Sequence, residues 1–583
     1  MSKSLDKKQS VAKTMQEIAL LLELKGESPF KSRAYYNAAR TLELLGEEEL
    51  RRLVQEDRLQ EIQGIGTALN EKIKELVSTG SLKYYEDLKA DIPEGLLEML
   101  KVPGLGPRKI KTLHDMLGVK TLGELEYACK ENRLVALKGF GAKTQEKIMK
   151  GIAFLRRSQG LYFYNEAHQI ALDLLASLKD FSGLLEASLA GSIRRCKEIV
   201  KDIDLVASST DPAGLTRYFA ELPQVAEVVA RGETKVTVQL QEGIQADLRV
   251  VESEAYPFAL QHFTGSKEHN TALRQRAKAM GMKINEYGLF HGEERLAGKS
   301  ESDLFQALGL AYIPPELREN YGEIEAAEKG ELPELVEEGD IQGIFHLHSA
   351  YSDGVNSLEE VVRFCRDAGF TYVGISDHSQ TAFYAGGLKE ADLREQMEAI
   401  DRLREKYPEV TIFKGIESDI KSDGSLDYPD AILEQLDFVI ASVHSGLGMP
   451  GEKMTARLLT TLDHPRVTML GHPTGRLLLG REGYSLDLEK VLEKALENGV
   501  IIELNASPSR LDLDWRHLKK VKEMGLMVSI NPDAHSLEDI QDTRLGVAMA
   551  RKGWLEKKDV FNTRSREEVE AYLSTRQLAA SGK

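Results

Sequence analysis

Apolar positions follow a helical period through the first 155 residues of the chain. Between Ser10 and Lys25, apolar side chains recur at the three- and four-residue spacing of one helix face. That face comprises Val11, Met15, Ile18, Ala19 and Leu22. Similar short periods follow, separated by glycine-containing turns. We therefore predict that residues 1–155 form short amphipathic helices.

The pattern changes to mixed helix and strand over residues 156–315. A helical period over about 164–179 precedes three strand-like alternations, at Asp202–Ala207, Thr234–Leu240 and Gln245–Val251. Residues 258–315 have a mixed pattern. Residues 316–340 are acidic and lack a strong apolar face, which fits a linker or a solvated helix equally well.

A strand–helix alternation begins at residue 341. Its seven strand-like runs are Ile344–His348, Tyr372–His378, Thr411–Glu417, Phe438–His444, Val467–His472, Val500–Asn505 and Met527–Asn531. Strands that alternate with helices indicate a parallel sheet, and seven in succession favour a barrel. Most of these runs end in a polar residue, and barrel sites lie at the carboxyl ends of the strands.

Nine potential metal ligands stand at or near the ends of these runs. They are His346, His348, Asp353, His378, Glu417, His444, His472, Asp533 and His535. The chain has 13 histidines, and six of them belong to this set. Imidazole and carboxylate ligands in this number exceed the needs of one ion, so we predict two or three metal ions and hydrolysis at phosphorus.

Three segments of the first 155 residues repeat one glycine pattern, at 62–73, 102–113 and 137–148. Each places an apolar residue between two glycines just before a helix start, using Gly64, Gly66, Gly104, Gly106, Gly139 and Gly141. The glycines allow a tight turn, and the free N–H groups of the following helix suit a phosphate. The segments resemble helix-hairpin-helix motifs, which implies DNA binding without reading of sequence.

The charge distribution agrees with that expectation. The whole chain has a net charge of −17, but residues 1–160 hold 28 Lys+Arg and 23 Asp+Glu, a net of +5. The remainder, 48 against 70, carries −22. Backbone phosphates require only a local basic face.

A second candidate centre lies in the stretch LAGSIRRCKEIVKDIDLVAS, residues 189–208. Gly191 and Ser192 are placed to hold a triphosphate, and Arg195 to neutralise a leaving pyrophosphate. Asp202 and Asp204 are two apart on a predicted strand, so both face the same side.

Asp247 adds a third carboxylate from another predicted strand. Three convergent carboxylates of this kind would hold two Mg²⁺ ions for nucleotidyl transfer.

These motifs resemble the family X DNA polymerases, which include polymerase β. The resemblance covers roughly residues 1–315 and includes G-S-I-R-R, D-I-D, Phe263-Thr264-Gly265-Ser266 and Ile284-Asn285-Glu286-Tyr287. It implies that His262, Phe263 and Gly265 shape the sugar pocket, Asn270 contacts the incoming base, and Arg274 contacts the template strand. His262 replaces a tyrosine found in many relatives, and Lys201 replaces a frequent glycine.

Lys72 occupies the position of the Schiff-base lysine in the 5′-deoxyribose-phosphate lyase site of that family. A lysine amine with a lowered pKa can attack an opened abasic sugar. Lys72 also fits a solvated helix face or a plain phosphate contact, and the neighbouring Ala68 replaces a lysine of many relatives.

The nine-ligand set resembles the PHP (polymerase and histidinol phosphatase) domain over about residues 340–572. The resemblance implies a three-metal form that uses Mn²⁺ or Zn²⁺, with all nine ligand positions filled. Arg476 and Arg510 are candidates for binding substrate phosphate, or are surface charges.

These interpretations predict a multidomain chain with six segments. They are an N-terminal lyase-like helical domain (1–88), a helix-hairpin-helix domain (89–155), an α+β nucleotidyltransferase palm (156–257), a nascent-base-pair subdomain (258–315), a linker (316–340) and a distorted (β/α)7 PHP barrel (341–583).

The predicted function is gap filling in base excision repair on gapped or primer–template DNA with dNTPs. The barrel is predicted to act as a 3′→5′ exonuclease, and also as a 3′-end phosphatase or an AP endonuclease. Two alternatives remain: a small-molecule phosphatase of the histidinol-phosphate type tethered to a DNA-binding module, and a non-catalytic DNA-end scaffold. The chain has no signal-peptide pattern and no long apolar run, so we expect a cytoplasmic, monomeric protein.

Overall fold

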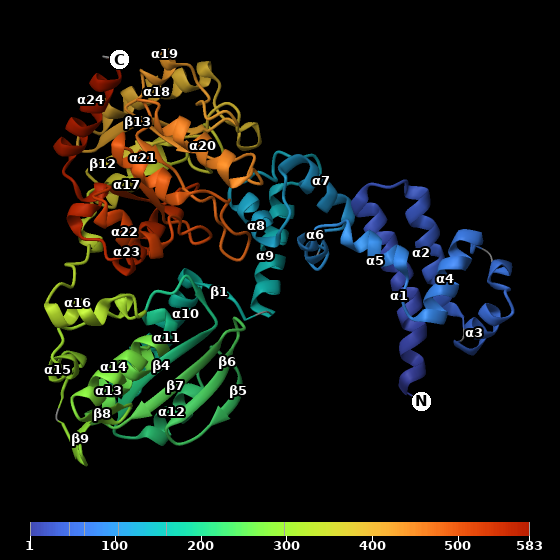
Figure 1. The fold of residues 1–583 in the computed structure, drawn as a ribbon, viewed down its shortest axis with the longest axis horizontal. Coiled ribbons are helices and arrows are strands. Elements are labelled where there is room, and N and C mark those ends of the chain that lie inside the picture. Colours follow the sequence, from blue (N-terminus) through green and yellow to red (C-terminus); the bar gives the residue numbers. More distant parts are fainter. Residues whose placement is uncertain are drawn as a thin grey trace. The chain divides into compact units, whose positions relative to one another are not determined.

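The computed structural model describes residues 2–45, 47–62, 64–102, 104–158, 160–296 and 298–581. The chain divides into two compact units, Met1–Leu155 and Arg156–Lys583. Within these ranges, the first unit is helical and the second contains every sheet (Figure 1). None of the described helices has the length and apolar character required to cross a membrane.

The first unit is built from nine described α-helices. They are α1 (Ser2–Lys25), α2 (Pro29–Leu44), α3 (Glu47–Gln55), α4 (Thr67–Thr79), α5 (Lys83–Ala90), α6 (Glu94–Met99), α7 (Pro107–Leu117), α8 (Leu122–Lys130) and α9 (Ala142–Ser158). The apolar face expected for α1 is buried in their common core, with Met15, Ile18 and Leu22 fully inaccessible. This confirms the predicted helical N-terminal region.

The three glycine segments form tight turns before α4, α7 and α9. Gly64, Gly104 and Gly139 have φ angles of +96°, +82° and +92°, a backbone region that L side chains rarely adopt. Gly66 and Gly106 are the N-cap residues of α4 and α7. The glycine spacing therefore follows from the backbone of the turn.

The second unit begins with a five-stranded sheet in the order β2-β4-β7-β6-β5. Its strands are β2 (Leu184–Leu189), β4 (Asp202–Ser209), β5 (Val225–Arg231), β6 (Lys235–Leu240) and β7 (Gln245–Val251). The strands β1 (Tyr162–Phe163) and β3 (Ile199–Val200) pair separately. The helices α10 (Tyr164–Leu178), α11 (Gly191–Arg194) and α12 (Pro212–Ala220) complete the region.

Alternate residues of β4 face opposite sides of this sheet. Leu205 and Ala207 pack in the core with α10 and α12. Val206 packs on the other side against α13 (Tyr256–Thr264). Asp202 and Asp204 lie four and two residues before Val206 on the same strand, so their side chains face the α13 side as well.

The following region contains α13, α14 (Lys267–Ala279), β8 (Met282–Asn285), β9 (Gly288–His291), β10 (Glu294–Arg295) and α15 (Glu301–Ala307). Residues 316–340 do not form a free linker. They contain α16 (Glu323–Lys329), and Leu317, Ile324 and Ala327 are buried in the core of the preceding region. The segment contains too few apolar residues for a helical period to be recognised from its sequence alone.

A buried ion-pair cluster joins α11 to α15. Arg194 binds the Glu301 carboxylate through two nitrogens at 2.9 and 2.6 Å, and Arg318 binds it at 2.6 Å. Burial alone would raise the pKa of Glu301, but Arg318 and Arg194 outweigh it and lower the pKa to about 2. Glu301 is thus ionised and paired throughout the physiological pH range.

Replacing Glu301 by glutamine is expected to lower the free energy of unfolding of the second unit by about 3 kcal/mol near pH 7, because the buried Arg318 and the partly buried Arg194 lose their counter-charge. The pKa in the folded state lies below that of an unfolded glutamate, so this stabilisation is present above pH ~4.3 and is lost as the pH falls toward 2. Urea denaturation of the wild type and the variant at pH 7 and pH 3 measures the difference. Equal stabilities at pH 7 would contradict the prediction, and the exposed Glu268→Gln substitution is the control.

The rest of the second unit is a seven-stranded parallel barrel in sequential strand order. Its strands are β11 (Gly343–Leu347), β12 (Tyr372–Ile375), β13 (Thr411–Asp419), β14 (Phe438–Ser442), β15 (Met469–Leu470), β16 (Ile501–Asn505) and β17 (Val528–Asn531). A parallel bridge between Leu347 and Ala534 brings the first and last strands together. The barrel and its seven strands were predicted from the sequence and are confirmed.

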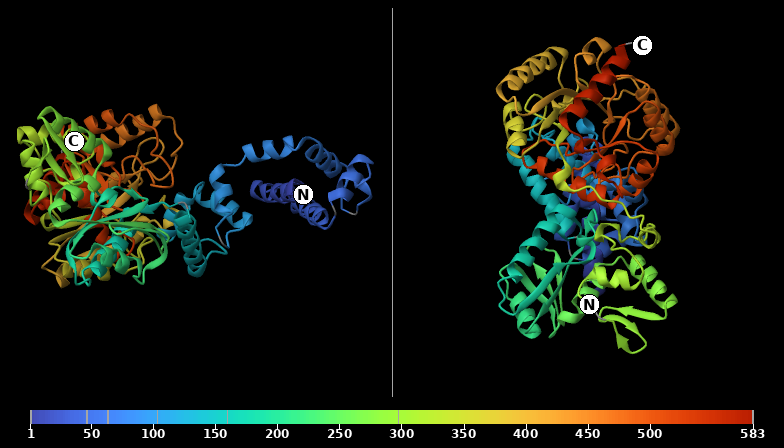
Figure 2. Two further views of the ribbon diagram at one scale, coloured as in Figure 1. Left: turned by 90° about the horizontal axis from the view of Figure 1, so that it is seen from below. Right: turned by 90° about the vertical axis from the view of Figure 1, so that its left-hand side faces the viewer.

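Helices follow most of the strands and surround the barrel (Figures 1 and 2). They are α17 (Leu358–Asp367), α18 (Glu390–Lys406), α19 (Asp430–Leu433), α20 (Gly451–Leu462), α21 (Leu488–Glu497), α22 (Trp515–Glu523) and α23 (Thr543–Lys552), followed by α24 (Arg566–Ser581).

A β-bulge in β11 turns consecutive residues into the barrel. Ile344 and Leu347 pack outward with α17, whereas Phe345 belongs to the aromatic core of the barrel. His346 has a φ of +60°, and the pairing register shifts between Ile344 and Leu347. The bulge lets Phe345 fill the interior while His346 also reaches the carboxyl end of the barrel.

Candidate active sites

The first candidate site is a cavity of about 360 Å³ between the five-stranded sheet and the helices α13 and α14. Ten predicted residues line it: Gly191, Ser192, Arg195, Asp202, Asp204, His262, Phe263, Gly265, Asn270 and Arg274. Lys267, at the start of α14, also lines the cavity and was not predicted. Its only sequence signal is its place directly after Phe263-Thr264-Gly265-Ser266.

Three carboxylates meet at one side of this cavity. Asp204 lies opposite Asp247 in the parallel pairing of β4 with β7, and Asp202 precedes Asp204 by two residues. Burial and the charges of Asp202 and Asp247 raise the pKa of Asp204 to about 6, and burial also raises the pKa of Asp202. Lys235 approaches Asp247 at 2.9 Å. Carboxylates clustered this closely suit divalent cations, which would replace protons as counter-charges.

The glycine–serine turn lies directly against these carboxylates. Gly191 has a φ of +58°, and a Cβ there would collide with the Asp204 carboxylate. The buried Ser192 hydroxyl has no hydrogen-bond partner among the described residues. The turn therefore offers backbone N–H groups and a hydroxyl to an anion in the cavity.

The far side of the cavity is held in place by α13 and α14. The Asn270 side chain donates to the His262 carbonyl at 2.7 Å and accepts from the Gln261 amide at 2.7 Å. The Arg249 guanidinium lies over the Phe263 ring, with its Cζ 4.4 Å from the ring centroid. His262 and Phe263 contact each other edge to face.

The second candidate site lies at the carboxyl ends of the barrel strands. The structure brings together all nine ligands that the sequence predicted. Eight of them form three groups of mutually close ligand atoms: His348, Asp353, His378 and His535; His346, His348 and Asp533; and His378, Glu417 and His444. The ninth, His472, lies beside Glu417. Three of the ligands, His346, His472 and Asp533, have positive φ angles. Strained backbone of this kind is common at functional sites.

Glu417 lies at the centre of the cluster. Its Oε1 is 3.2 Å from His346 Nε2, 3.3 Å from His444 Nε2 and 3.0 Å from His472 Nε2. Its Oε2 is 2.8 Å from His378 Nδ1. One carboxylate therefore contacts imidazoles from four different strand ends.

Asp353 and Asp533 complete the cluster on either side of His348. Asp533 Oδ1 is 3.3 Å from His348 Nε2, and Asp353 Oδ1 is 3.4 Å from His535 Nε2. Asp353 Oδ2 is 3.5 Å from His378 Nε2.

The electrostatics of the cluster fit bound cations. Burial disfavours protonation of His444, but Glu417 and Asp419 outweigh it and raise its pKa to about 9. Burial and the charges of His535 and His378 lower the pKa of His348 to about 3. Imidazoles and carboxylates packed this closely, with no thiolate among them, suit divalent metal cations.

Carboxylates outside the nine orient the ligands and were not predicted. Glu503 accepts from His346 Nδ1 at 2.6 Å and from the His472 backbone N–H at 2.6 Å. Asp419 contacts His444 Nδ1 at 2.5 Å. Such partners fix ring orientation in metal sites. Glu503 lies 157 residues from His346, and Asp419 lies 25 residues from His444, so no local spacing in the sequence indicates either carboxylate.

The two candidate phosphate-binding arginines differ in position. Arg510 is buried beside the cluster, with Nε 3.5 Å from Asp533 Oδ2. Arg476 donates to the carbonyls of Arg510 and Leu511 and pairs with Asp514. Its donors are used in packing, which favours a structural role for Arg476.

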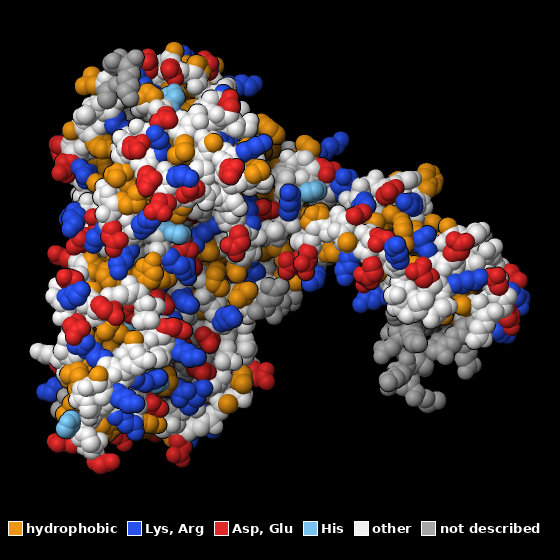
Figure 3. Space-filling view, viewed as in Figure 1, with side chains coloured by type: hydrophobic (Ala, Val, Ile, Leu, Met, Phe, Trp, Pro, Cys, Tyr) orange, Lys and Arg blue, Asp and Glu red, His pale blue; other side chains and the backbone are white. Residues whose placement is uncertain are grey.

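Lys72 and the glycine turns belong to the first unit. Lys72 Nζ lies 4.6 Å from the centroid of the Tyr84 ring and 3.4 Å from the Ala68 carbonyl. On the face of the molecule shown in Figure 3, basic and acidic side chains are interspersed.

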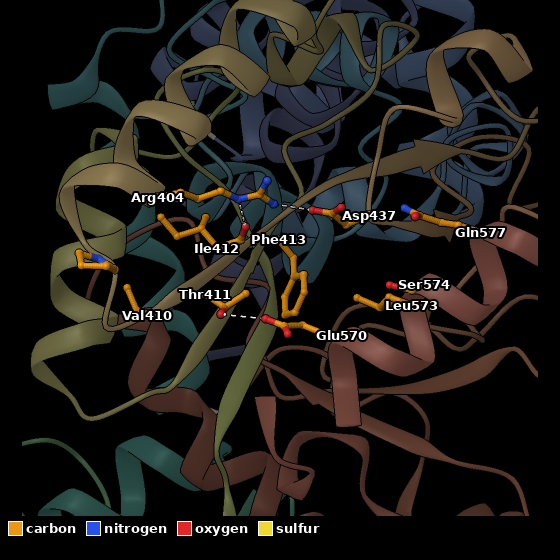
Figure 4. Close-up of a pocket in the computed structure, with 11 residues that line it drawn as sticks. Arg404, Val410, Thr411, Ile412, Phe413, Asp437, Glu570, Leu573, Ser574 and Gln577 are labelled. Atoms are coloured by element: carbon orange, nitrogen blue, oxygen red, sulfur yellow. Dashed lines mark hydrogen bonds and ion pairs between the residues drawn. The ribbon is translucent and has the colours of Figure 1, made fainter. Parts of the chain in front are cut away.

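Another cavity, of about 460 Å³, lies at the amino ends of the barrel strands beneath α24 (Figure 4). Arg404 there donates to the Ile412 carbonyl and pairs with Asp437 at 2.6 Å, and Thr411 donates to Glu570. Because these polar groups already satisfy one another, the cavity offers little to a ligand.

Comparison with known families matches four segments of the chain. Two helix-hairpin-helix models, one a SAM-like tandem, match residues 6–82 and 96–153. The DNA polymerase beta thumb model matches residues 259–319, and the PHP domain model matches residues 345–507.

Individual relatives match either the whole chain or the barrel alone. The chain is 40% identical over 570 residues to the DNA polymerase/3′-5′ exonuclease PolX of Bacillus subtilis, an alignment that covers 97% of this chain and 99% of the relative. The chain is 29% identical over 254 residues to a probable phosphatase of Thermoanaerobacter sp. strain X514, an alignment that covers 41% of this chain and 96% of the relative. A probable phosphatase of Clostridium acetobutylicum is 30% identical over 207 residues, an alignment that covers 33% of this chain and 77% of the relative.

Proposed function

The chain belongs to the family X DNA polymerases that carry a C-terminal PHP domain, and we propose that it fills short gaps in DNA during repair. In this proposal, the palm cavity adds nucleotides and the barrel removes them from 3′ ends. The barrel would also release 3′-terminal phosphates or cleave at abasic sites, which are related hydrolyses at phosphorus.

One observation carries the proposal: a single chain holds two complete ligand sets. The palm has three carboxylates beside a cavity of about 360 Å³. In the barrel, eight of the nine predicted ligands form three close groups, and His472 contacts Glu417. A DNA-end scaffold would require neither set.

In the palm, Asp202, Asp204 and Asp247 would hold Mg²⁺, which supplies charge neutralisation and activation of a primer 3′-hydroxyl. The Gly191–Ser192 turn would bind the triphosphate through N–H groups and the free hydroxyl. Arg195 would neutralise the leaving pyrophosphate. His262 and Phe263 would shape the sugar pocket, and Asn270 would contact the base.

In the barrel, the nine ligands would hold two or three Mn²⁺ or Zn²⁺ ions, which supply Lewis acidity and a hydroxide near neutral pH. Arg510, which is buried beside Asp533, would neutralise a substrate phosphate. Glu503 and Asp419 would keep the imidazole rings in the orientation that ligation requires.

The similarity of the barrel region to probable phosphatases favours one second candidate, hydrolysis of a small phosphate monoester. In that case the DNA-binding regions would serve only as a tether. The intact palm carboxylates argue against such a passive role.

A 5′-labelled primer bordering a one-nucleotide gap tests the proposal. With Mg²⁺ or Mn²⁺ and dNTPs the primer is expected to lengthen, and with Mn²⁺ alone it is expected to shorten. Lengthening without shortening would favour the small-monoester candidate for the barrel. No change in either reaction would overturn the proposal.

We propose 5′-deoxyribose-phosphate lyase activity at Lys72 as a separate step of the same repair. The lysine is only partly buried, so an opened sugar can reach it. Borohydride treatment should trap an incised abasic substrate on the wild type and not on Lys72→Ala. Equal trapping on both would exclude Lys72 as the nucleophile.

A further inference from the structure

The palm segment 191–198, which begins with α11 and continues through Arg195, packs directly against the barrel within the second unit. Cys196 lies in the same apolar core as barrel residues, including Trp515 of α22 and Met549 of α23. Glu198 pairs with Arg516 at 3.1 Å. The loop that carries Ser192 and Arg195 therefore rests on the helices that follow the last barrel strands.

Lys552, the last residue of α23, is a fully buried cation of this junction. Its side chain has no solvent exposure. Its ammonium group donates to the Arg195 carbonyl at 2.8 Å, to the Glu319 carboxylate at 2.7 Å and to the Glu316 carbonyl at 3.3 Å. A buried ammonium is costly unless its donors are satisfied, and here all three have acceptors outside the barrel.

Glu319 connects Lys552 to the Arg195 side chain. The same oxygen, Oε1, accepts from Lys552 Nζ and from Arg195 Nε, the latter at 3.1 Å. Arg195 Nη1 donates to the Thr264 carbonyl. Lys552 thus holds Arg195 by its backbone carbonyl and, through Glu319, by its guanidinium.

We infer that Lys552 of the barrel domain is a positioning residue for nucleotide addition, because it fixes Arg195 where that arginine lines the nucleotide cavity. The barrel then completes the nucleotide site of the palm, in addition to holding its own metal centre. This inference rests on the proposed role of Arg195 in binding the triphosphate.

The test is single-nucleotide incorporation by the full-length Lys552→Met variant, with KM for the dNTP and kcat measured separately. We expect kcat/KM to fall at least about tenfold, mostly through KM, because Arg195 loses its fixed orientation toward the phosphates. The 3′→5′ exonuclease rate, measured on the same preparation, should stay within about twofold and shows that the barrel is folded.

Lys519→Met is the matched control. Lys519 also crosses the junction, donating to the Tyr321 carbonyl at 3.2 Å and lying 3.9 Å from the centroid of the Trp554 ring, but it does not contact Arg195. It should leave KM for the dNTP within about twofold. Equal losses in Lys519→Met and Lys552→Met would indicate general weakening of the junction and overturn the inference.

A second pair of variants covers the case in which Lys552→Met does not fold. Glu319→Gln removes the charge that joins Lys552 to Arg195 and should raise KM for the dNTP. The matched control Glu316→Gln changes the carboxylate that pairs with Arg551 at 2.8 Å and leaves Glu319 in place. Equal KM values for Glu319→Gln and the wild type would overturn the inference.

Arg195→Ala separates failure of this inference from failure of the proposed function. Adding Lys552→Met to Arg195→Ala should cause little further loss, because the two residues act as one unit. Additive losses would contradict positioning through Arg195. If Arg195→Ala incorporates nucleotides as well as the wild type does, the proposed role of Arg195 fails, and this inference fails with it. If Arg195→Ala is impaired but Lys552→Met is not, only this inference fails.

Discussion

Replacing Asp204 by asparagine is expected to reduce nucleotide incorporation roughly 10³-fold, which corresponds to about 4 kcal/mol of lost transition-state stabilisation. Asp204 lies opposite Asp247, two residues from Asp202 and against Gly191, so its carboxylate would help to hold the metal ions that neutralise the triphosphate. Asparagine keeps the size of the side chain and removes the charge. The measurement is primer extension across a one-nucleotide gap under single-turnover conditions.

The exonuclease rate of the same variant should remain within about twofold of the wild type, because the barrel cluster contains none of the palm carboxylates. Asp180→Asn, an exposed substitution in the turn after α10, is the matched control. Retention of most incorporation activity by Asp204→Asn would remove the palm carboxylates from the reaction. Loss of both activities would instead indicate damage to the fold.

Replacing Glu417 by glutamine is expected to reduce 3′→5′ degradation roughly 10³-fold and to leave incorporation within about twofold. The Glu417 carboxylate contacts His346, His378, His444 and His472, so its loss affects more ligands than any other single change in the cluster. Glutamine fits the same space but cannot balance the charge of a cation.

Metal binding by Glu417→Gln can be measured without activity. Mn²⁺ should raise the Tm of the wild type by mass action, and EDTA should reverse that shift. The shift should shrink in Glu417→Gln and persist in Glu405→Gln, which changes an exposed residue of α18. A full Mn²⁺ shift in Glu417→Gln would show that the ion binds elsewhere.

Local pattern in the sequence was sufficient for the barrel and its cluster. Each apolar run in the sequence ends in, or is followed directly by, a ligand or another polar residue, and parallel strands in a barrel bring those ends together. The positions of His378, Glu417 and His444 therefore followed from periodicity alone. The same holds for Asp202 and Asp204, since residues two apart on a strand share a face.

The glycine turns were also determined locally. A positive φ at Gly64, Gly104 and Gly139 is a property of the backbone within a few residues, so the repeated spacing was a sufficient signal. The structure of residues 316–340 could not be predicted locally. The segment has few buried residues, and these pack against α14, α15 and the barrel.

Tertiary structure alone decided which charges act together. Lys552 reaches Arg195 across 357 residues, and Glu503 reaches His346 across 157. Buried charges are retained where partners satisfy them, and a partner that far along the chain leaves no periodic trace near either residue. The chemistry of each centre was therefore present in the local sequence, whereas the orientation of its side chains and the link between the two centres arose from packing of the second unit.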